Sequence, residues 1–182
     1  MLVAEDNNMN QLLATKMFKK IGYIIEIANN GKEAVEKLKN EGLKNIELLE
    51  IDVANQHSVN NARIELGKKT QVLDVLINNA GIQHVARLED FPEQKWQQLL
   101  QVMLTGPAML TKAVLPLMQQ QGFGRVINIG SIHALVASPF KSAYVAAKHG
   151  LLGFSKVVAL ENANFDFTIN TICPAYVRTP LV

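Results

Sequence analysis

The sequence predicts an α/β protein: a six-stranded parallel sheet between two layers of helices, folded as a single domain over residues 1–182. Two observations carry this prediction. Short apolar runs bounded by turn residues alternate with longer helical patterns, which is the arrangement of right-handed βαβ units. Strands such as "VLDVLIN" and "RVINIG" are apolar almost throughout, as is typical of strands covered by helices on both faces.

The expected elements follow one another along the whole chain. Apolar runs bounded by turn residues predict strands at 1–5, 23–28, 46–52, 73–78, 125–130 and 167–173. Longer helical patterns predict helices at 9–20, 31–40, 57–67, 92–119 and 140–160. Between the second helix and the third strand, the polar stretch 41–45 is the expected junction, because Gly42 is placed to end the helix before it.

Bulk composition limits the possible partners. With 48% hydrophobic residues in 182, the chain can bury one sizeable core. The formal net charge of +2 comes from scattered lysines, so we expect no nucleic-acid partner. The single cysteine, Cys173, excludes an internal disulfide. No apolar run reaches the roughly 18 residues of a membrane span. Because the first strand starts at Met1, we also expect no signal peptide, and hence a cytoplasmic protein without a membrane partner.

The stretch "SAYVAAKHG" predicts an acid–base pair on a helix. Tyr144 and Lys148 stand four residues apart and share one helix face, so the ammonium can lie near the phenol oxygen. A nearby cation lowers the pKa of a tyrosine, as a general acid or base for a carbonyl or an alcohol requires. Ser131 follows the strand "RVINIG", at the strand end where open α/β sheets place ligands. By itself, a Tyr/Lys pair at this spacing usually has a structural role. Together with the serine, the pair favours a catalytic role.

A second motif follows the strand "LDVLIN". Its residues "NNAG" are small or polar and let a ligand approach the backbone, although a simple strand-ending turn explains them as well. At this point residues 46–182 resemble the short-chain dehydrogenases/reductases, and within that family D-3-hydroxybutyrate dehydrogenases. The resemblance is carried by "DVLINNAGIQH", "GRVINIGSIHALVAS", "KSAYVAAKHGL" and "ICPAYVRTPLV".

The resemblance implies a role for each matching residue. Tyr144 would be the proton donor or acceptor, Lys148 would lower its pKa and hold the nicotinamide ribose, and Ser131 would bind the reacting oxygen. NAD would be the cofactor and a small hydroxy acid the substrate. The implied cofactor contacts are Asp52, Val53, Asn78, Ala80, Gly81, Pro174 and Thr179, and the implied contacts to the substrate carboxylate are Gln83, His133 and Lys141. In many family members the helix matching 140–160 packs between subunits, which implies a homo-oligomer.

The sequence departs from the family pattern at four points. "AEDNNMNQ" stands where the family has a glycine-rich phosphate-binding turn, and Glu5 and Asp6 oppose a pyrophosphate. Met103 replaces an asparagine that helps hold a proton-relay water, and Ala175 replaces a glycine. The sequence also stops at Val182, before the substrate lid. We therefore expect binding of NAD to be weak or lost.

Residues 1–40 resemble a different family, the receiver domains of two-component response regulators. "LVAEDNNMNQLLATKMFKKIGYIIEIANNGKEAVEKL" follows their opening: a strand ending in an acidic pair, a helix, a second strand, "NG" and a second helix. In receivers this pair binds Mg²⁺, so Glu5 and Asp6 are a weak candidate metal site, and a helix start explains them as well. We do not expect Mg²⁺ binding, because the strand order favoured below separates Asp52 from this pair. We expect no phosphorelay function either, because no phosphoryl-binding lysine follows "RVINIG".

Three hypotheses follow. The leading one is an engineered chimera or fold-evolution scaffold, joining a receiver fragment, 1–40, to a dehydrogenase fragment, 46–182, without native activity. The alternatives are a residual NAD-dependent 3-hydroxybutyrate dehydrogenase and a phospho-accepting receiver module. Because the third and later strands lie in the dehydrogenase part, a Rossmann-like strand order, 3-2-1-4-5-6, is favoured over the flavodoxin-like 2-1-3-4-5, which would bring Asp52 beside Glu5 and Asp6.

Overall fold

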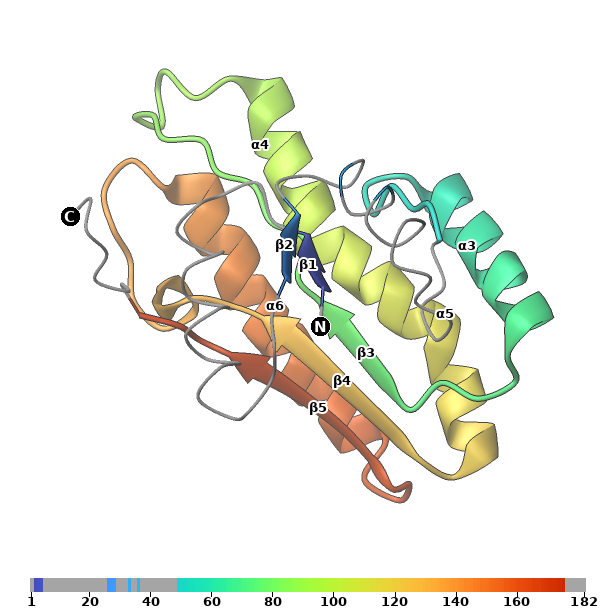
Figure 1. Cartoon of the computed structure of the whole chain (residues 1–182). Helices are drawn as coiled ribbons and strands as arrows, with labels where there is room; N and C mark the ends of the chain where they lie inside the picture. The colour runs from blue at the N-terminus through green and yellow to red at the C-terminus, as the bar shows by residue number, and fades with distance from the viewer. Residues whose placement is uncertain (1, 5–25, 29–32, 34–35, 37–48, 176–182) are drawn as a thin grey trace. The chain divides into compact units, whose positions relative to one another are not determined.

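A computed structural model describes residues 2–4, 26–28, 33, 36 and 49–175 of the chain (Figure 1). The chain divides into two units, one of 1–48 with 177–182 and one of 49–176, so the single domain predicted over 1–182 stays a prediction. In the first unit, β1 (Leu2–Ala4) and β2 (Glu26–Ala28) form a parallel pair. This pairing fits both strand orders considered above, because the first two strands are neighbours in each.

The second unit carries a three-stranded parallel sheet with helices packed on one face (Figure 1). Its strands lie in chain order: β3 (Val75–Asn78), β4 (Gly124–Ile129) and β5 (Phe167–Ile172). The helices are α3 (Gln56–Lys69), α4 (Glu93–Leu100), α5 (Gly106–Gln121) and α6 (Ser142–Glu161). The strands and helices predicted from residue 57 onward are therefore confirmed, and so is the parallel α/β architecture.

One predicted strand is wrong where it is described. Residues 49–52, the described end of the strand expected at 46–52, have no strand conformation and lead into a turn at 53–54. The backbone N–H of Asp52 donates to Ser58 Oγ over 2.9 Å, at the start of α3. The Asp52 carboxylate in turn accepts from the N–H of Ala54 over 2.9 Å. The bond to Ser58 takes up the Asp52 N–H, which a neighbouring strand would otherwise bind.

The predicted sheet of six strands between two helix layers also stays unconfirmed. The described residues contain five strands in two separate sheets, so neither the sixth strand nor the full order is established. Within the second unit, helices cover one face of the sheet only. The other face leaves Val75 and Ile77 45% and 58% exposed. The expected second layer would involve the helices predicted at 9–20 and 31–40, which lie outside the described residues apart from Glu33 and Glu36.

A π-helical turn interrupts the long helix that the sequence predicts at 92–119. It spans Gln101–Thr105, between α4 and α5. Gly106 follows it, and a Cβ at this glycine would lie 2.6 Å from the carbonyl oxygen of Val53. Only glycine permits so close an approach. The turn and the glycine together hold the loop that contains Val53 against the N-terminus of α5, which matters for the site described below.

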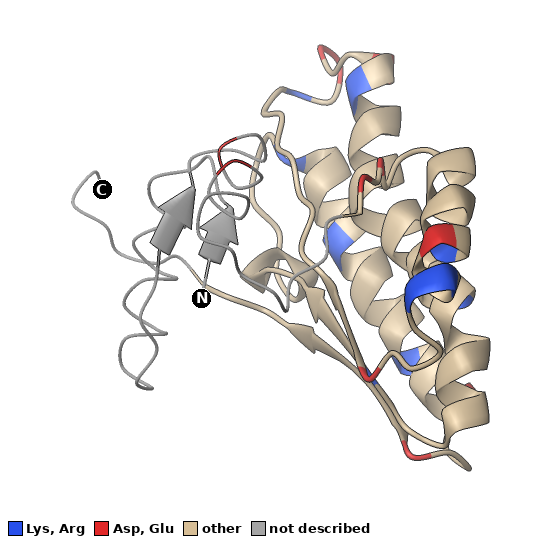
Figure 2. Cartoon of the chain, turned by 45° about the vertical axis from the view of Figure 1, so that its right-hand side comes forward, with Lys and Arg blue, Asp and Glu red and all other residues tan. Residues whose placement is uncertain are grey.

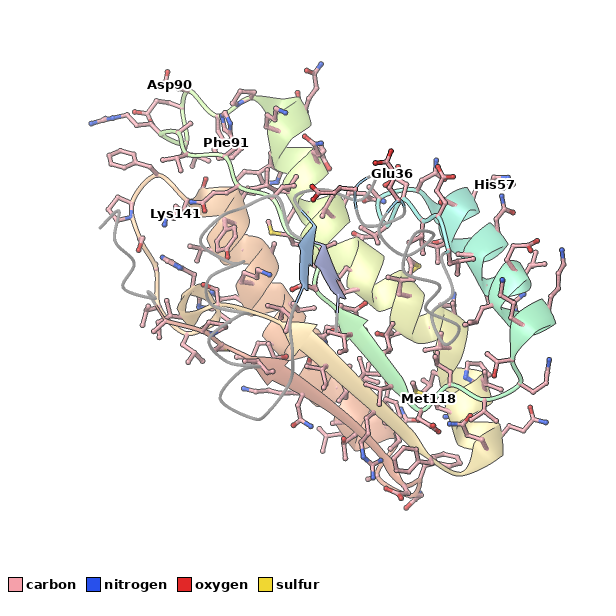
Figure 3. All side chains as sticks on the ribbon, viewed as in Figure 1. Glu36, His57, Asp90, Phe91, Met118 and Lys141 are labelled. Atoms are coloured by element: carbon pink, nitrogen blue, oxygen red, sulfur yellow. The ribbon has the colours of Figure 1, made fainter. Side chains whose placement is uncertain are left out.

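Two hydrophobic clusters form the core of the second unit. The first joins α5, α6, β4 and β5 through Val114, Met118, Val126, Val158, Phe167 and Ile169. Met118, labelled in Figure 3, is 1% exposed. The second cluster joins α4, the π-turn and α6 through Leu99, Met103, Ala143 and Ala147. By length and composition alone, the run Glu93–Gln121 is also apolar enough to cross a membrane, but four of its side chains belong to these two clusters.

Charged residues are spread over the described part of the second unit. Figure 2 shows lysines and arginines on several helices and loops, with acidic residues among them. Ion pairs in this part include Lys68 with Glu65 and Arg125 with Asp166, each at 2.6 Å. The distribution agrees with the scattered charges seen in the sequence, and the expected lack of a nucleic-acid partner remains a prediction.

Candidate active site

The three strands of the second unit end at one edge of the sheet, and candidate site residues follow each end. β3 ends at Asn78, β4 leads through Gly130 to Ser131, and β5 leads to Pro174. Two backbone hydrogen bonds tie the last two segments together: Gly130 N–H donates to the carbonyl of Ile172 over 2.7 Å, and Ile132 N–H donates to that of Pro174 over 2.8 Å. This is the edge at which open α/β sheets bind ligands.

Tyr144 and Lys148 lie on one face of α6, next to the end of β4. The Lys148 Nζ is 5.7 Å from the centre of the Tyr144 ring and donates a hydrogen bond to the carbonyl of Ile129 over 2.6 Å. The lysine is 4% exposed. The tyrosine ring is half-buried and meets the His133 ring edge-on, with centroids 5.9 Å apart. The helix therefore brings a cation and a phenol together beside Ser131, as the spacing in the sequence suggested.

Burial lowers the pKa of Lys148 from its ordinary value of 10.5 to about 8, with Cys173 acting weakly in the opposite direction. The cause is desolvation, which penalises the charged form of an amine. At neutral pH most of the population still carries the proton. At neutral pH the positive charge of Lys148 therefore lies near the Tyr144 ring. Lys148 loses this charge at a lower pH than an exposed lysine does.

Stability should depend on pH through Lys148. Below pH 8 the amine is protonated in both states, and between about 8 and 10.5 only the unfolded state keeps the proton. The free energy of unfolding should therefore rise by about 3 kcal/mol over this window. Lys148→Met should lack that rise, whereas Lys156→Met, at an exposed lysine of the same helix, should keep it. Urea unfolding at several pH values measures the effect, and parallel curves for wild type and Lys148→Met would contradict it.

Ser131 belongs to a short chain of side chains that ends at Ser138. Ser131 caps the 3-10 turn Ile132–Ala134, and its Oγ accepts from the backbone N–H of His133 over 3.2 Å. The same Oγ lies 3.2 Å from His133 Nδ1, and His133 Nε2 lies 2.7 Å from Ser138 Oγ. His133 is 4% exposed. Burial, and secondarily the charge of Lys141, lower its pKa, so the ring is neutral near pH 7.

Asn78 is part of a buried polar network that the sequence analysis missed. Its Nδ2 donates to Asn128 Oδ1 over 2.7 Å, and Asn128 Nδ2 donates to Ser155 Oγ over 2.9 Å. Ser155 Oγ lies 2.8 Å from Thr171 Oγ1. The register places Asn78, Asn128 and Thr171 in one row across the three strands. The Asn78 side chain therefore points into the core. The sequence signal for this was the second asparagine, Asn128, at the corresponding place in the strand "RVINIG".

Three of the five residues implied to contact the adenosine part of NAD line a cavity between α3, α5 and β3. Its volume is about 340 Å³, and its walls are mostly apolar, including Val53, Asn78 and Ala80. Its size and apolar lining suit part of a small ligand such as a flat base. The Oδ1 of Asn78 is buried without a hydrogen-bond partner among the described residues. These features fit the adenosine end of a dinucleotide. The other two implied contacts, Asp52 and Gly81, are each next in sequence to a residue that lines the cavity, and both are exposed.

The remaining candidate residues lie in different surroundings. Lys141 is the N-cap residue of α6 and is half-buried (Figure 3), and Gln83 is exposed in the loop after β3. Met103 is fully buried against Ala143 and Ala147, so its side chain packs in the core. Thr179, Glu5 and Asp6 lie outside the described residues. Within those residues no group of three or more His, Cys, Asp or Glu side chains could hold a metal ion.

Comparison with known proteins points to one family along most of the chain. The family model described as short chain dehydrogenase matches residues 8–182. The D-beta-hydroxybutyrate dehydrogenase of Rhizobium meliloti is 54% identical over 109 residues, which are 60% of this chain and 42% of that protein. The Escherichia coli 3-oxoacyl-[acyl-carrier-protein] reductase FabG is 32% identical over 172 residues, 94% of this chain and 68% of that protein. Thus the chain matches less than half the length of the first relative.

A solved structure gives the same result. The crystal structure of a short-chain dehydrogenase from Streptomyces avermitilis superposes with a TM-score of 0.79 and 28% identity, covering 99% of this chain and 67% of that one. The family match also includes most of residues 1–40, the segment that resembles a receiver. None of these findings supports a second family or an engineered joint in the chain.

Proposed function

The chain belongs to the short-chain dehydrogenase family, and from this premise we propose that it is an NAD-dependent oxidoreductase acting on a small hydroxy acid of the 3-hydroxybutyrate type. The observation that carries the proposal is that Lys148 bonds the carbonyl of Ile129 and Tyr144 meets the ring of His133, so that both act on the segment that contains Ser131 at the carboxyl edge of the sheet. The 54% identity to a D-beta-hydroxybutyrate dehydrogenase supports the choice of substrate class. The inactive chimeric scaffold gains no support from the family match, which runs through both parts of the chain.

Each of the three side chains has a distinct task. The Ser131 hydroxyl donates a hydrogen bond to the reacting oxygen of the substrate, so that oxygen is fixed beside α6. Tyr144 takes the alcohol proton as the phenolate during oxidation and returns it as the phenol during reduction. The Lys148 ammonium, held by the carbonyl of Ile129 at 2.6 Å, favours the phenolate form of Tyr144 electrostatically.

Asp52, Val53, Ala80 and Gly81 would hold the adenosine end of NAD, with Asn78 shaping the same wall from inside the sheet. Pro174 and Thr179 would lie toward its nicotinamide end. When bound, the cofactor supplies the acceptor for the hydride that leaves the hydroxyl-bearing carbon. Because "AEDNNMNQ" replaces the glycine-rich turn, affinity for the cofactor should be weak, and millimolar NAD is the appropriate range for assays.

The substrate carboxylate needs a cation, and Lys141 at the start of α6 supplies one. Gln83 and His133 are the other predicted contacts. A bond between an ammonium and a carboxylate is about twice as strong as a neutral one. Removing the Lys141 charge should therefore raise KM for a hydroxy acid without changing the chemical step.

Oxidation of D-3-hydroxybutyrate with NAD, followed by the absorbance of NADH, tests this function. We expect turnover with the acid, and for Lys141→Met a KM about tenfold higher with kcat nearly unchanged. The methyl ester of the substrate lacks the carboxylate, so its KM should not respond to Lys141→Met. Lys156→Met, at an exposed lysine on α6, is the matched control. Absence of NADH formation by the folded wild-type protein at millimolar NAD would refute the proposal.

A further inference from the structure

The segment that leads into α6 contains a strained residue. Among the described residues, Phe140 is the only residue other than glycine with a positive φ, at 66°. This left-handed conformation is unfavourable for a bulky residue, because its Cβ crowds the following carbonyl oxygen. The Phe140 side chain is 50% exposed, so core packing does not impose the conformation. Strain of this kind persists only where neighbouring groups hold it, and it gathers at functional sites.

Phe140 lies in a turn that joins two of the residues implied to bind the substrate carboxylate. Residues 139 and 140 form this turn, between Ser138 and Lys141. A proline followed by a residue with positive φ is the pattern of a type II turn, which normally has Gly or Asn at the second of these positions. At the start of the turn, Ser138 Oγ lies 2.7 Å from His133 Nε2. At its end, Lys141 is the N-cap residue of α6.

The loop that follows β3 holds Phe140 in place. The backbone N–H of Ala86 donates to the carbonyl of Phe140 over 3.0 Å, and the Arg87 guanidinium lies 5.9 Å from the centre of the Phe140 ring. Gln83, the third residue implied to bind the carboxylate, lies in the same loop. The segments that contain all three implied carboxylate contacts are therefore tied together at Phe140.

We propose that Phe140 is a positioning residue, whose left-handed backbone sets Lys141 beside His133 and so completes the subsite for the substrate carboxylate. This inference rests on the proposed dehydrogenase function. The charge of Lys141 already acts on His133, because it lowers the pKa of that ring, with burial as the larger cause. A negative φ at residue 140 would redirect Lys141, since the chain enters α6 directly after it.

Two substitutions separate the backbone conformation from the ring. Phe140→Ala and Phe140→Asn both remove the ring and its contact with Arg87, but asparagine adopts a positive φ more readily than alanine does. We expect Phe140→Ala to raise KM for the hydroxy acid about fivefold with kcat nearly unchanged, and Phe140→Asn to stay within about twofold of the wild type. KM for the methyl ester should respond to neither, because the ester lacks the carboxylate.

Phe165→Ala is the matched control, at an exposed phenylalanine without a positive φ, and it should leave KM unchanged. An equal rise of KM in Phe140→Ala and Phe140→Asn would assign the effect to the ring and overturn the proposal. A wild-type KM in Phe140→Ala would overturn it as well.

The pKa of His133 gives a readout that does not need activity. NMR titration of the histidine rings in the full chain measures it. Lys141→Met removes the charge and should raise this pKa. Phe140→Ala should raise it too, whereas Phe140→Asn should keep the wild-type value. Absence of a rise in Phe140→Ala overturns the proposal.

The two readouts also distinguish this proposal from the proposed function. If the pKa of His133 responds as expected but the wild type forms no NADH, Phe140 still positions Lys141, and the dehydrogenase function fails together with the carboxylate subsite. An active enzyme in which Phe140→Ala changes neither KM nor the pKa of His133 removes the positioning role alone.

Discussion

Replacing Tyr144 with phenylalanine should lower kcat for hydroxy-acid oxidation about a thousandfold. The substitution removes one oxygen and keeps the ring that packs on α6 and meets His133 edge-on. A positioned acid–base group contributes typically ~10²–10⁴-fold to a rate. Without the phenol, the alcohol proton has no acceptor beside Lys148, whose own amine is engaged by the carbonyl of Ile129. The loss should fall on kcat, because the phenol serves the transition state more than it serves binding.

Two measurements control for indirect effects of Tyr144→Phe. The melting temperature should stay within a few degrees of the wild type, since the ring remains in place. The dissociation constant for NADH, followed by fluorescence, should change by less than about threefold, which corresponds to well under 1 kcal/mol. A variant that keeps more than a tenth of the wild-type kcat would contradict the assignment of Tyr144 as the proton acceptor.

Periodicity and motif spacing predicted the second unit well. The helices at 56–69 and 142–161 and the strands at 124–129 and 167–172 lie within two residues of their expected bounds. The Tyr144/Lys148 pair was predictable because a spacing of four residues fixes a shared helix face without any tertiary information. Ser131 was predictable because it follows a parallel strand, where the chain reverses into the ligand edge.

Two predicted elements differ from the structure, because periodicity does not show which specific contacts form. The strand expected at 46–52 ends without strand conformation at 49–52, because Asp52 bonds to Ser58 and Ala54. The π-turn at 101–105 interrupts a helix whose apolar pattern is continuous. Specific contacts override the periodic pattern in both cases. The carboxylate-binding role expected of His133 stays a prediction.

The sequence offered only one signal for the buried row of Asn78, Asn128 and Thr171, the asparagine shared by "LDVLIN" and "RVINIG", because register decides which residues meet across strands. Asn128 lies at its centre and is fully buried. It accepts from Asn78 over 2.7 Å and donates to Ser155 on α6 over 2.9 Å. The row therefore ties the ligand edge of the sheet to the helix that carries Tyr144 and Lys148.

Asn128→Ala should consequently destabilise the protein by about 3 kcal/mol. The change removes two buried hydrogen bonds. It deprives the Asn78 amide of its near acceptor, at about 1–3 kcal/mol for a buried donor left unsatisfied, and costs about 1 kcal/mol for the bond to Ser155, whose hydroxyl keeps its contacts to Leu151 and Thr171. Asn170→Ala is the matched control on β5, because its side chain is exposed, and it should cost less than about 0.5 kcal/mol. Urea unfolding of the three proteins at one pH gives both values.

A double-mutant cycle then separates the network from simple loss of volume. Ser155 also donates to the carbonyl of Leu151 over 2.8 Å, so Ser155→Ala alone loses packing and one helical contact besides its bond to Asn128. If Asn128 and Ser155 act through their shared bond, the double variant should be less destabilised than the sum of the singles by about 1 kcal/mol. Strict additivity would mean that the 2.9 Å contact contributes nothing measurable, and that the Asn128 effect is a cavity effect. The sheet edge and α6 would then be held together by the hydrophobic clusters and by the bonds of Lys148 to Ile129 and of Ser155 to Thr171.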